Sequence, residues 1–150
     1  MRSLLLCAVL LMLAVPAQAG EVDCRYFTIN LPDDWTVVEK PAEDADGIFA
    51  AVFGEKAKTA SISLVSGSSE GKGAKELADL LAPSASATET PKEHEGQYGF
   101  AISANGVEGF CILSEGKGRF LLSCMNGNVP VAAKVIATIK SDKYSELIPK

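Results

Sequence analysis

Alternating apolar and polar residues predict several β-strands along this chain. From Cys24 to Leu31, apolar side chains at every second position alternate with Tyr26, Thr28 and Asn30, which is typical of a half-buried strand. Pro32–Asp34 then forms a turn. The other strands predicted by the pattern cover residues 35–38, 48–54, 59–66, 98–104, 107–114 and 119–125, with a polar loop at 39–47.

Helical spacing replaces the alternation in two segments. Apolar residues recur at i, i+3, i+4 and i+7 from Ala74 to Leu81, and Pro83 ends this helix. The second helix has the same spacing from Ala132 to Ile139, with Pro130 in its first turn. Residues 84–95 between the elements are polar and form either a loop or an exposed edge strand.

The order strands, helix, strands, helix predicts an α+β fold with an antiparallel β-sheet and two amphipathic helices. Asn105-Gly106 is a strong two-residue hairpin signal, because both positions accept a positive φ. Gly116–Gly118 makes a similar link between the next two strands. Sequential strands joined by such short links pair antiparallel in most proteins.

Residues 1–19 have the pattern of a cleavable secretory signal peptide. Arg2 precedes an apolar run from Leu4 to Val15, and Ala17-Gln18-Ala19 supplies the small residues of a cleavage site. An apolar run this short spans only ~18 Å of helix, against a hydrocarbon core of ~30 Å. The pattern therefore favours a removed signal over a membrane anchor, with Cys7 leaving as part of it.

What remains, residues 20–150, is expected to be a single globular domain with a loosely ordered tail at 141–150 and no integral membrane segment. We expect it in the periplasm or in the medium. The formal net charge of the whole chain is −5, and its lysines are scattered among glutamates. Nucleic acids and anionic membrane surfaces need clustered Lys and Arg, so neither is an expected partner.

Residues 27–35, with the sequence Phe-Thr-Ile-Asn-Leu-Pro-Asp-Asp-Trp, resemble the opening of the PsbP/Mog1-like group of small exported proteins. The order of elements over about residues 25–140 is also similar to that group. The resemblance implies an antiparallel sheet between helices, an α/β/α sandwich of the Mog1/PsbP type. It also implies an accessory or binding role, since members of the group serve as photosystem accessory subunits or binding partners, and it supplies no catalytic residues to carry over.

Three cysteines, Cys24, Cys111 and Cys124, follow the signal, and thiols pair readily in an exported protein. If Glu115 faces Phe120 across the turn, position 111 lies directly opposite 124, where facing Cβ atoms are ~4.5–5.5 Å apart. We expect a disulfide there. A bridge from Cys24 to either partner is the alternative. A spare Cys24 would be free, buried or linked to a partner chain.

The residues that carry chemistry in most enzymes are sparse. His94 is the single histidine, and its neighbours Glu93 and Glu95 cannot join it on one side of an extended segment to make three metal ligands. The sequence contains no Cys-x-x-Cys motif. We therefore expect no catalytic, metal or cofactor site.

Three aromatic residues, Phe27, Trp35 and Phe49, are expected to form core, with Trp35 as a contact surface if it faces an exposed pocket. These observations favour a non-enzymatic exported module that binds a protein partner or a small ligand. One alternative is a small exported hydrolase with a carboxylate or metal site. Another is a structural subunit linked through the spare cysteine.

Overall fold

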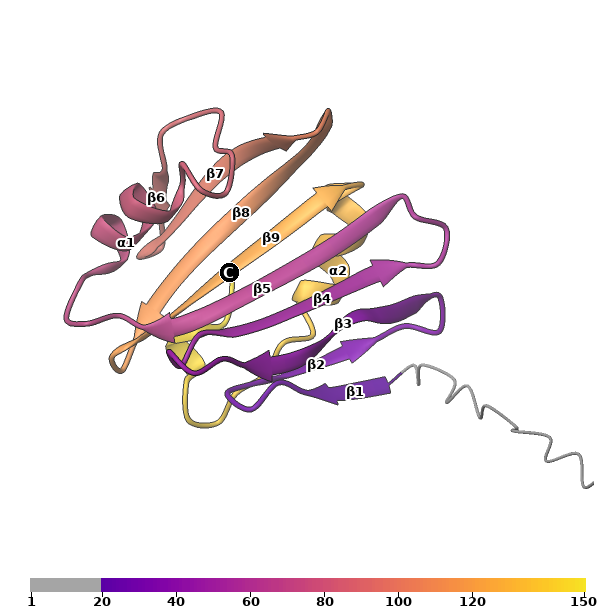
Figure 1. Ribbon diagram of the computed structural model, residues 1–150, viewed down its shortest axis with the longest axis horizontal. Helices are drawn as coiled ribbons and strands as arrows, with labels where there is room; N and C mark the ends of the chain where they lie inside the picture. Colours follow the sequence, from indigo (N-terminus) through magenta and orange to yellow (C-terminus); the bar gives the residue numbers. More distant parts are fainter. Residues whose placement is uncertain (1–19) are drawn as a thin grey trace, which may run out of the picture.

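The computed structural model describes residues 20–150, and the predicted signal peptide at 1–19, Cys7 included, lies outside the described residues. A seven-stranded antiparallel sheet has the order β3-β4-β5-β9-β8-β7-β6, and β1 and β2 form a separate hairpin beside it (Figure 1). The strands are β1 (Gly20–Asp23), β2 (Thr28–Leu31), β3 (Trp35–Glu43), β4 (Phe49–Glu55), β5 (Ala60–Ser68), β6 (Lys92–His94), β7 (Gln97–Ala104), β8 (Val107–Gly116) and β9 (Arg119–Gly127). The helices are α1 (Ala74–Leu81), α2 (Val129–Ile136) and the short 3-10 helix η1 (Ser145–Leu147).

Two tight turns fix the register of the C-terminal meander. Asn105 and Gly106 join β7 to β8 with φ angles of 53° and 77°, and Lys117 and Gly118 join β8 to β9 with φ angles of 51° and 77°. Positive φ at both central residues is the type I′ geometry that matches the twist of the flanking strands. Both predicted hairpins are confirmed.

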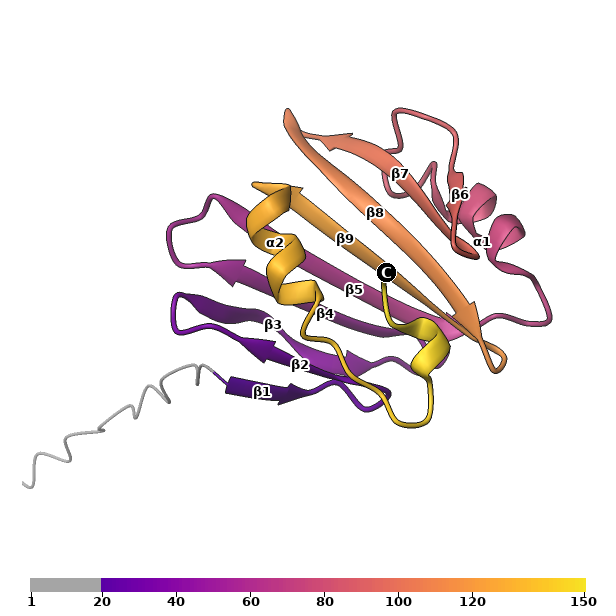
Figure 2. The same ribbon diagram turned by 180° about the vertical axis from the view of Figure 1, so that it is seen from behind.

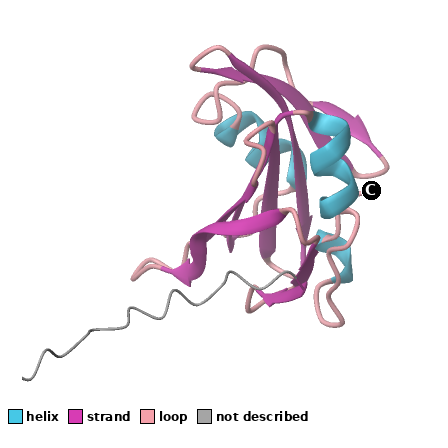
Figure 3. Cartoon of the chain, turned by 90° about the vertical axis from the view of Figure 1, so that its right-hand side faces the viewer, coloured by secondary structure: helices cyan, strands magenta, loops and turns pink. Residues whose placement is uncertain are grey.

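Helices cover the two faces of the large sheet, as the view along its edge shows (Figure 3). The alternation along β9 separates two cores: Leu121 and Met125 lie in the cluster that includes α2, whereas Phe120 and Leu122 lie in the cluster that includes α1. The predicted α+β fold and α/β/α sandwich are therefore confirmed.

Each helix covers only part of its face. α2 packs mainly on β2, β5 and β9, whereas α1 packs on β7 and β8. Because the helices lie over different strands, α1 leaves its face of β3–β5 uncovered, and on the other face the C-terminal η1, rather than α2, packs on β8. Within residues 20–150, no helix has the length and apolar character needed to cross a membrane.

The single strand expected at 24–31 is instead a reversal followed by β2. Arg25 has a φ of 65°, and its backbone N–H donates to Asp23 Oδ1 at 2.7 Å. The Cys24 N–H donates to the Phe27 carbonyl at 2.9 Å, which closes the turn. Phe27, Ile29 and Leu31 are buried as expected. The prediction of a single strand failed because the alternating pattern does not mark the turn that precedes β2.

The strand expected at 35–38 and the loop expected at 39–47 were also wrong in extent, since β3 continues to Glu43. Its pairing with β4 shifts register between Val37 and Glu39 and again between Glu39 and Ala42. Such bulges interrupt the period of two, so the second half of β3 has no strand pattern. Pro41 is tolerated because β3 is an edge strand of the large sheet.

The tail at 141–150, expected to be loosely ordered, is packed on the sheet. Leu147 is only 1% exposed. The Gln97 amide donates to the Ile148 carbonyl at 2.7 Å and accepts from the Lys150 N–H at 2.9 Å. These contacts join residues far apart in sequence, so no local pattern could reveal them.

In the segment 84–95, the edge-strand alternative is confirmed as β6.

Candidate functional site

Tyr26 is the centre of a group of aromatic and arginine side chains at the turn between β1 and β2. The guanidinium carbon of Arg119 lies 3.6 Å from the Tyr26 ring centroid, and that of Arg25 lies 5.6 Å from it. Tyr144 and Phe49 meet the same ring edge-on, with centroids 5.8 and 6.3 Å away. These are attractive cation–π and edge-to-face contacts, and they hold the ring in one orientation.

Glu43 fixes the outer end of this group. Its carboxylate accepts a hydrogen bond from the Tyr26 hydroxyl and forms an ion pair with Arg25 at 3.1 Å. The hydrogen bond to Glu43 is the main cause of a raised pKa of Tyr26; burial and the Glu43 charge also raise this pKa, and the two arginines lower it. The hydroxyl therefore remains a protonated donor at neutral pH.

The Arg119 side chain is hydrogen-bonded to Ser66 of β5. Its Nη1 donates to Ser66 Oγ at 3.3 Å, and the buried Ser66 hydroxyl donates in turn to the Phe120 carbonyl at 2.7 Å. Among residues 20–150, no carboxylate lies within 4.0 Å of the Arg119 guanidinium. The contacts of this guanidinium are thus the face of the Tyr26 ring and the Ser66 hydroxyl.

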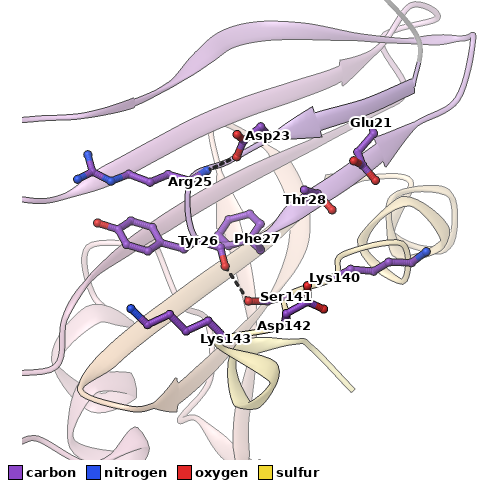
Figure 4. Close-up of a pocket in the computed structure, with 10 residues that line it drawn as sticks. All are labelled: Glu21, Asp23, Arg25, Tyr26, Phe27, Thr28, Lys140, Ser141, Asp142 and Lys143. Carbon is purple, nitrogen blue, oxygen red and sulfur yellow. Dashed lines mark hydrogen bonds between the residues drawn. The ribbon is translucent and has the colours of Figure 1, made fainter.

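An open pocket of about 460 Å³ lies beside Tyr26, between the β1–β2 turn and residues 140–143 (Figure 4). Backbone hydrogen bonds of 2.8 and 3.0 Å between Thr28 and Lys140 fix the second wall, and the Ser141 hydroxyl donates to the Tyr26 carbonyl at 2.7 Å. Arg25, Tyr26 and Lys143 direct their polar ends to the same side of the pocket, whereas Lys140 points the other way (Figure 4).

The pocket combines both signs of charge. Arg25, Lys140 and Lys143 line it together with the acids Glu21, Asp23 and Asp142. Within the described part of the chain, no three His, Cys, Asp or Glu side chains are grouped so as to hold a metal ion. The arrangement offers aromatic surface, hydrogen-bond donors and ion-pairing groups, and such groups suit the recognition of a polar partner.

The predicted disulfide is present. Cys111 and Cys124 are cross-strand neighbours with a Cα–Cα distance of 4.1 Å and an S–S bond of 2.01 Å. Glu115 faces Phe120 in the same ladder, which confirms the register from which the pairing was predicted. The alternative bridges from Cys24 are therefore wrong.

Cys24 and Trp35 lie inside the protein. Cys24 is free and fully buried, and burial, with a smaller contribution from Asp23, raises the pKa of its thiol to about 12. A thiol in that position cannot reach another chain, which contradicts the alternative of a subunit linked through the spare cysteine. Trp35 is 2% exposed, in the same core cluster as Phe27 and Phe49, so its suggested role as a contact surface is also wrong.

The residues of the Tyr26 site were not recognised from the sequence. Tyr26 was placed only on the polar side of a strand, and Arg119 only at the start of another. Their contact depends on the turn at Arg25 and on the pairing of β5 with β9, neither of which has a local pattern. The one available signal for the turn was Asp23, because an aspartate side chain often accepts a hydrogen bond from the backbone N–H of the residue two positions later, here Arg25.

Neither protein-family models nor curated proteins give a match to this chain. Several solved structures are similar to it, and two of them are described here. A protein of Bacteroides thetaiotaomicron VPI-5482 is 21% identical over 86% of this chain and 51% of its own, with a TM-score of 0.47. The solution structure of cyanobacterial PsbP (CyanoP) from Synechocystis sp. PCC 6803 is 10% identical over 85% of this chain and 95% of its own, with a TM-score of 0.49.

This chain thus spans about half the length of the Bacteroides protein. The PsbP group, which residues 27–35 resemble, is represented among the structures with a similar fold.

Proposed function

We propose that this protein is an exported, non-enzymatic binding module that holds a protein partner at the pocket beside Tyr26. The observation that carries the proposal is that Tyr26 and Arg25 line an open pocket while the Arg119 guanidinium lies over the Tyr26 ring. Arginine and tyrosine are enriched at the centres of protein interfaces and among the residues that dominate binding energy.

The site is also ordered before any partner arrives. Tyr26 is fixed by Glu43 and by the edge of Tyr144, and Arg119 is fixed by Ser66. Immobilising a long side chain on binding costs roughly 0.5–1.5 kcal/mol. A partner that docks here avoids part of that cost, because these side chains are already held.

Export is supported by two features. The signal pattern at 1–19 directs the chain out of the cytoplasm, and the disulfide between Cys111 and Cys124 is of the kind that persists in oxidising compartments. We place the protein in the periplasm or the medium on this basis.

A charge reversal with a matched control tests the proposal. Arg25 and Lys75 are both exposed cations with one ion pair each, to Glu43 and Asp79, and Lys75 lies on α1, away from the pocket. We expect chemical cross-linking in the native envelope to join the wild type and the Lys75→Glu variant to the same protein, and Arg25→Glu to lose that product. Equal yields from all three proteins would overturn the proposal.

A small exported hydrolase is the second candidate, and it is favoured by the three carboxylates that share the pocket, Glu21, Asp23 and Asp142. Assays of the purified, metal-free protein against ester and peptide substrates test this candidate. Turnover that disappears in the Asp142→Asn variant would establish the hydrolase and refute the non-enzymatic proposal.

A further inference from the structure

The end of the chain crosses the large sheet between two anchor points. In Figure 2, η1 and the residues that follow it lie on the same side of the sheet as α2, and η1 packs on β8 and β9. Glu146 lies directly over Gly116 of β8, where an added Cβ atom would overlap the Cβ of Glu146. Further along, both polar atoms of the Gln97 amide on β7 are hydrogen-bonded to the backbone of the chain end. We call this segment, residues 144–150, the strap.

Ser114 lies beneath the strap, between the two anchor points. It precedes Gly116 by two residues on β8, so both residues are on the same face of the sheet. In the β7–β8 ladder Tyr98 faces Leu113, and Gln97 and Ser114 are the next neighbours in that ladder. The strap passes from Gly116 to Gln97, and it therefore covers Ser114.

Two hydroxyl groups on this face are buried without a hydrogen-bond partner. Ser114 and Ser123 are both fully buried, and neither Oγ has a partner among residues 20–150. Ser123 faces Ile112 in the β8–β9 ladder, so it lies on the same face as Ser114. The buried Ser66 hydroxyl, in contrast, donates to the Phe120 carbonyl. An unpartnered buried hydroxyl opposes the closed structure by about a factor of ten in the equilibrium constant.

Leu147 and the Gln97 amide hold the strap on the sheet. The Leu147 side chain is 1% exposed, and the two hydrogen bonds of Gln97 fix the segment after it. The ion pair between Lys117 and Glu146 is 3.6 Å long, and about half of each side chain is exposed. Such surface pairs add little stability. The strap is thus closed by a small number of contacts, and the hydroxyls beneath it favour opening because water can bond to them once it is lifted.

We propose that the strap opens as a unit while the large sheet stays folded, and that the hydroxyls of Ser114 and Ser123 set its opening equilibrium. Segments with few buried contacts open locally at a lower free energy than the whole protein. Opening also separates Tyr144 from the ring of Tyr26. The strap is therefore a conformational device at the end of the chain that controls one of the contacts ordering the Tyr26 ring.

Hydrogen exchange of the purified exported protein, followed by NMR, tests this proposal. The backbone N–H groups of Leu147 and Lys150 are hydrogen-bonded in the closed strap, so their exchange reports its opening. We expect both to exchange at least about 100-fold faster than the amides of β9. The Ser114→Ala, Ser123→Ala double variant should slow their exchange by at least about tenfold, and Ser114→Ala alone by at least about threefold.

Ser63→Ala is the matched control. Ser63 is half-buried and faces Cys124 in the β5–β9 ladder, on the opposite face of the sheet from the strap. This variant should leave the exchange rates of the strap within about twofold of the wild type. The proposal is overturned if the strap amides exchange no faster than those of β9, or if the serine variants leave the strap rates unchanged.

Discussion

Cys111 lies directly opposite Cys124 in the β8–β9 ladder, and a disulfide joins their sulfur atoms. The two residues are 13 positions apart, so the bridge closes a short loop around the Lys117-Gly118 turn. It lies within the cluster under α1, with Cys111 fully buried and Cys124 9% exposed.

Removing this bridge should destabilise the protein. Closing a loop of this size stabilises a fold by about 3 kcal/mol, largely by restricting the unfolded chain. We expect the Cys111→Ala, Cys124→Ala double variant to lose about that much in urea-induced unfolding. Wild-type protein unfolded in the presence of a reductant is the control and should show a similar loss. An unchanged midpoint in the double variant would contradict the prediction.

Because of Cys24, the free energy of unfolding should fall as the pH rises into the alkaline range. Its pKa rises from 9.0 to about 12 in the folded protein, so between these values the unfolded state releases the proton and the folded state keeps it. This contribution to stability is complete below pH 9 and is lost as pH rises toward 12. Relative to neutral pH, the loss at pH 10.5 is about 2 kcal/mol.

The Cys24→Ala variant isolates that contribution, because the other groups titrate in both proteins. Urea unfolding of each protein at pH 8 and pH 10.5 should give a fall in stability that is about 2 kcal/mol larger for the wild type. Falls of the same size in the two proteins would show that the thiol does not cause the effect.

Leu147 should be as important to stability as a residue of the central sheet, although it lies near the end of the chain. The side chain is 1% exposed, and truncating a buried leucine costs about 2–5 kcal/mol. Leu80 on α1, at 61% exposed, is the matched control, and its replacement should change stability by less than ~0.5 kcal/mol. If Leu147→Ala and Leu80→Ala unfold at the same urea concentration, the tail is not packed.

Gly109 should not accept a side chain. An added Cβ would lie 2.2 Å from the Met125 carbonyl oxygen, which belongs to the neighbouring strand backbone and cannot rotate away. We expect Gly109→Ala to cost about 3 kcal/mol in thermal or urea unfolding. Gly73→Ala, where the added atom meets nothing within 4 Å, should cost under ~1 kcal/mol. Comparable stability of the two variants would refute the close strand approach.

Tyr26 and Arg119 should stabilise each other. Their ring-to-guanidinium distance of 3.6 Å predicts a coupling free energy of about 0.5–1 kcal/mol at a partly exposed site. A double-mutant cycle with Tyr26→Leu, Arg119→Met and the combined variant measures it from unfolding free energies. Additive effects would mean that the stack does not contribute to stability in solution.

Elements with strong local signals were predicted well from the sequence. The Asn105-Gly106 turn, the period of α1 and the facing of Glu115 with Phe120 each depend on neighbours in the chain, and the disulfide followed from that facing. Signals of this kind need no knowledge of distant segments.

Errors occurred where distant contacts decide the local structure. Arg25 adopts a positive φ without the glycine that usually marks one, and the Asp23 side chain accepts a hydrogen bond from its backbone N–H. The order of the tail depends on Gln97, which lies on β7. The candidate site was missed for the same reason, since Tyr26 meets Arg119 only after β9 has paired with β5.

The pairing of β5 with β9 has a practical consequence. This ladder runs from Ala60 opposite Gly127 to Ser68 opposite Arg119 without a shift in register, and it is the single strand pairing of the large sheet that joins β3–β5 to β6–β9. A cut near Gly71 would leave every local hairpin within one fragment or the other. The two pieces are therefore suited to reassembly as a split protein, in which recovery of the fold reports that both halves have met.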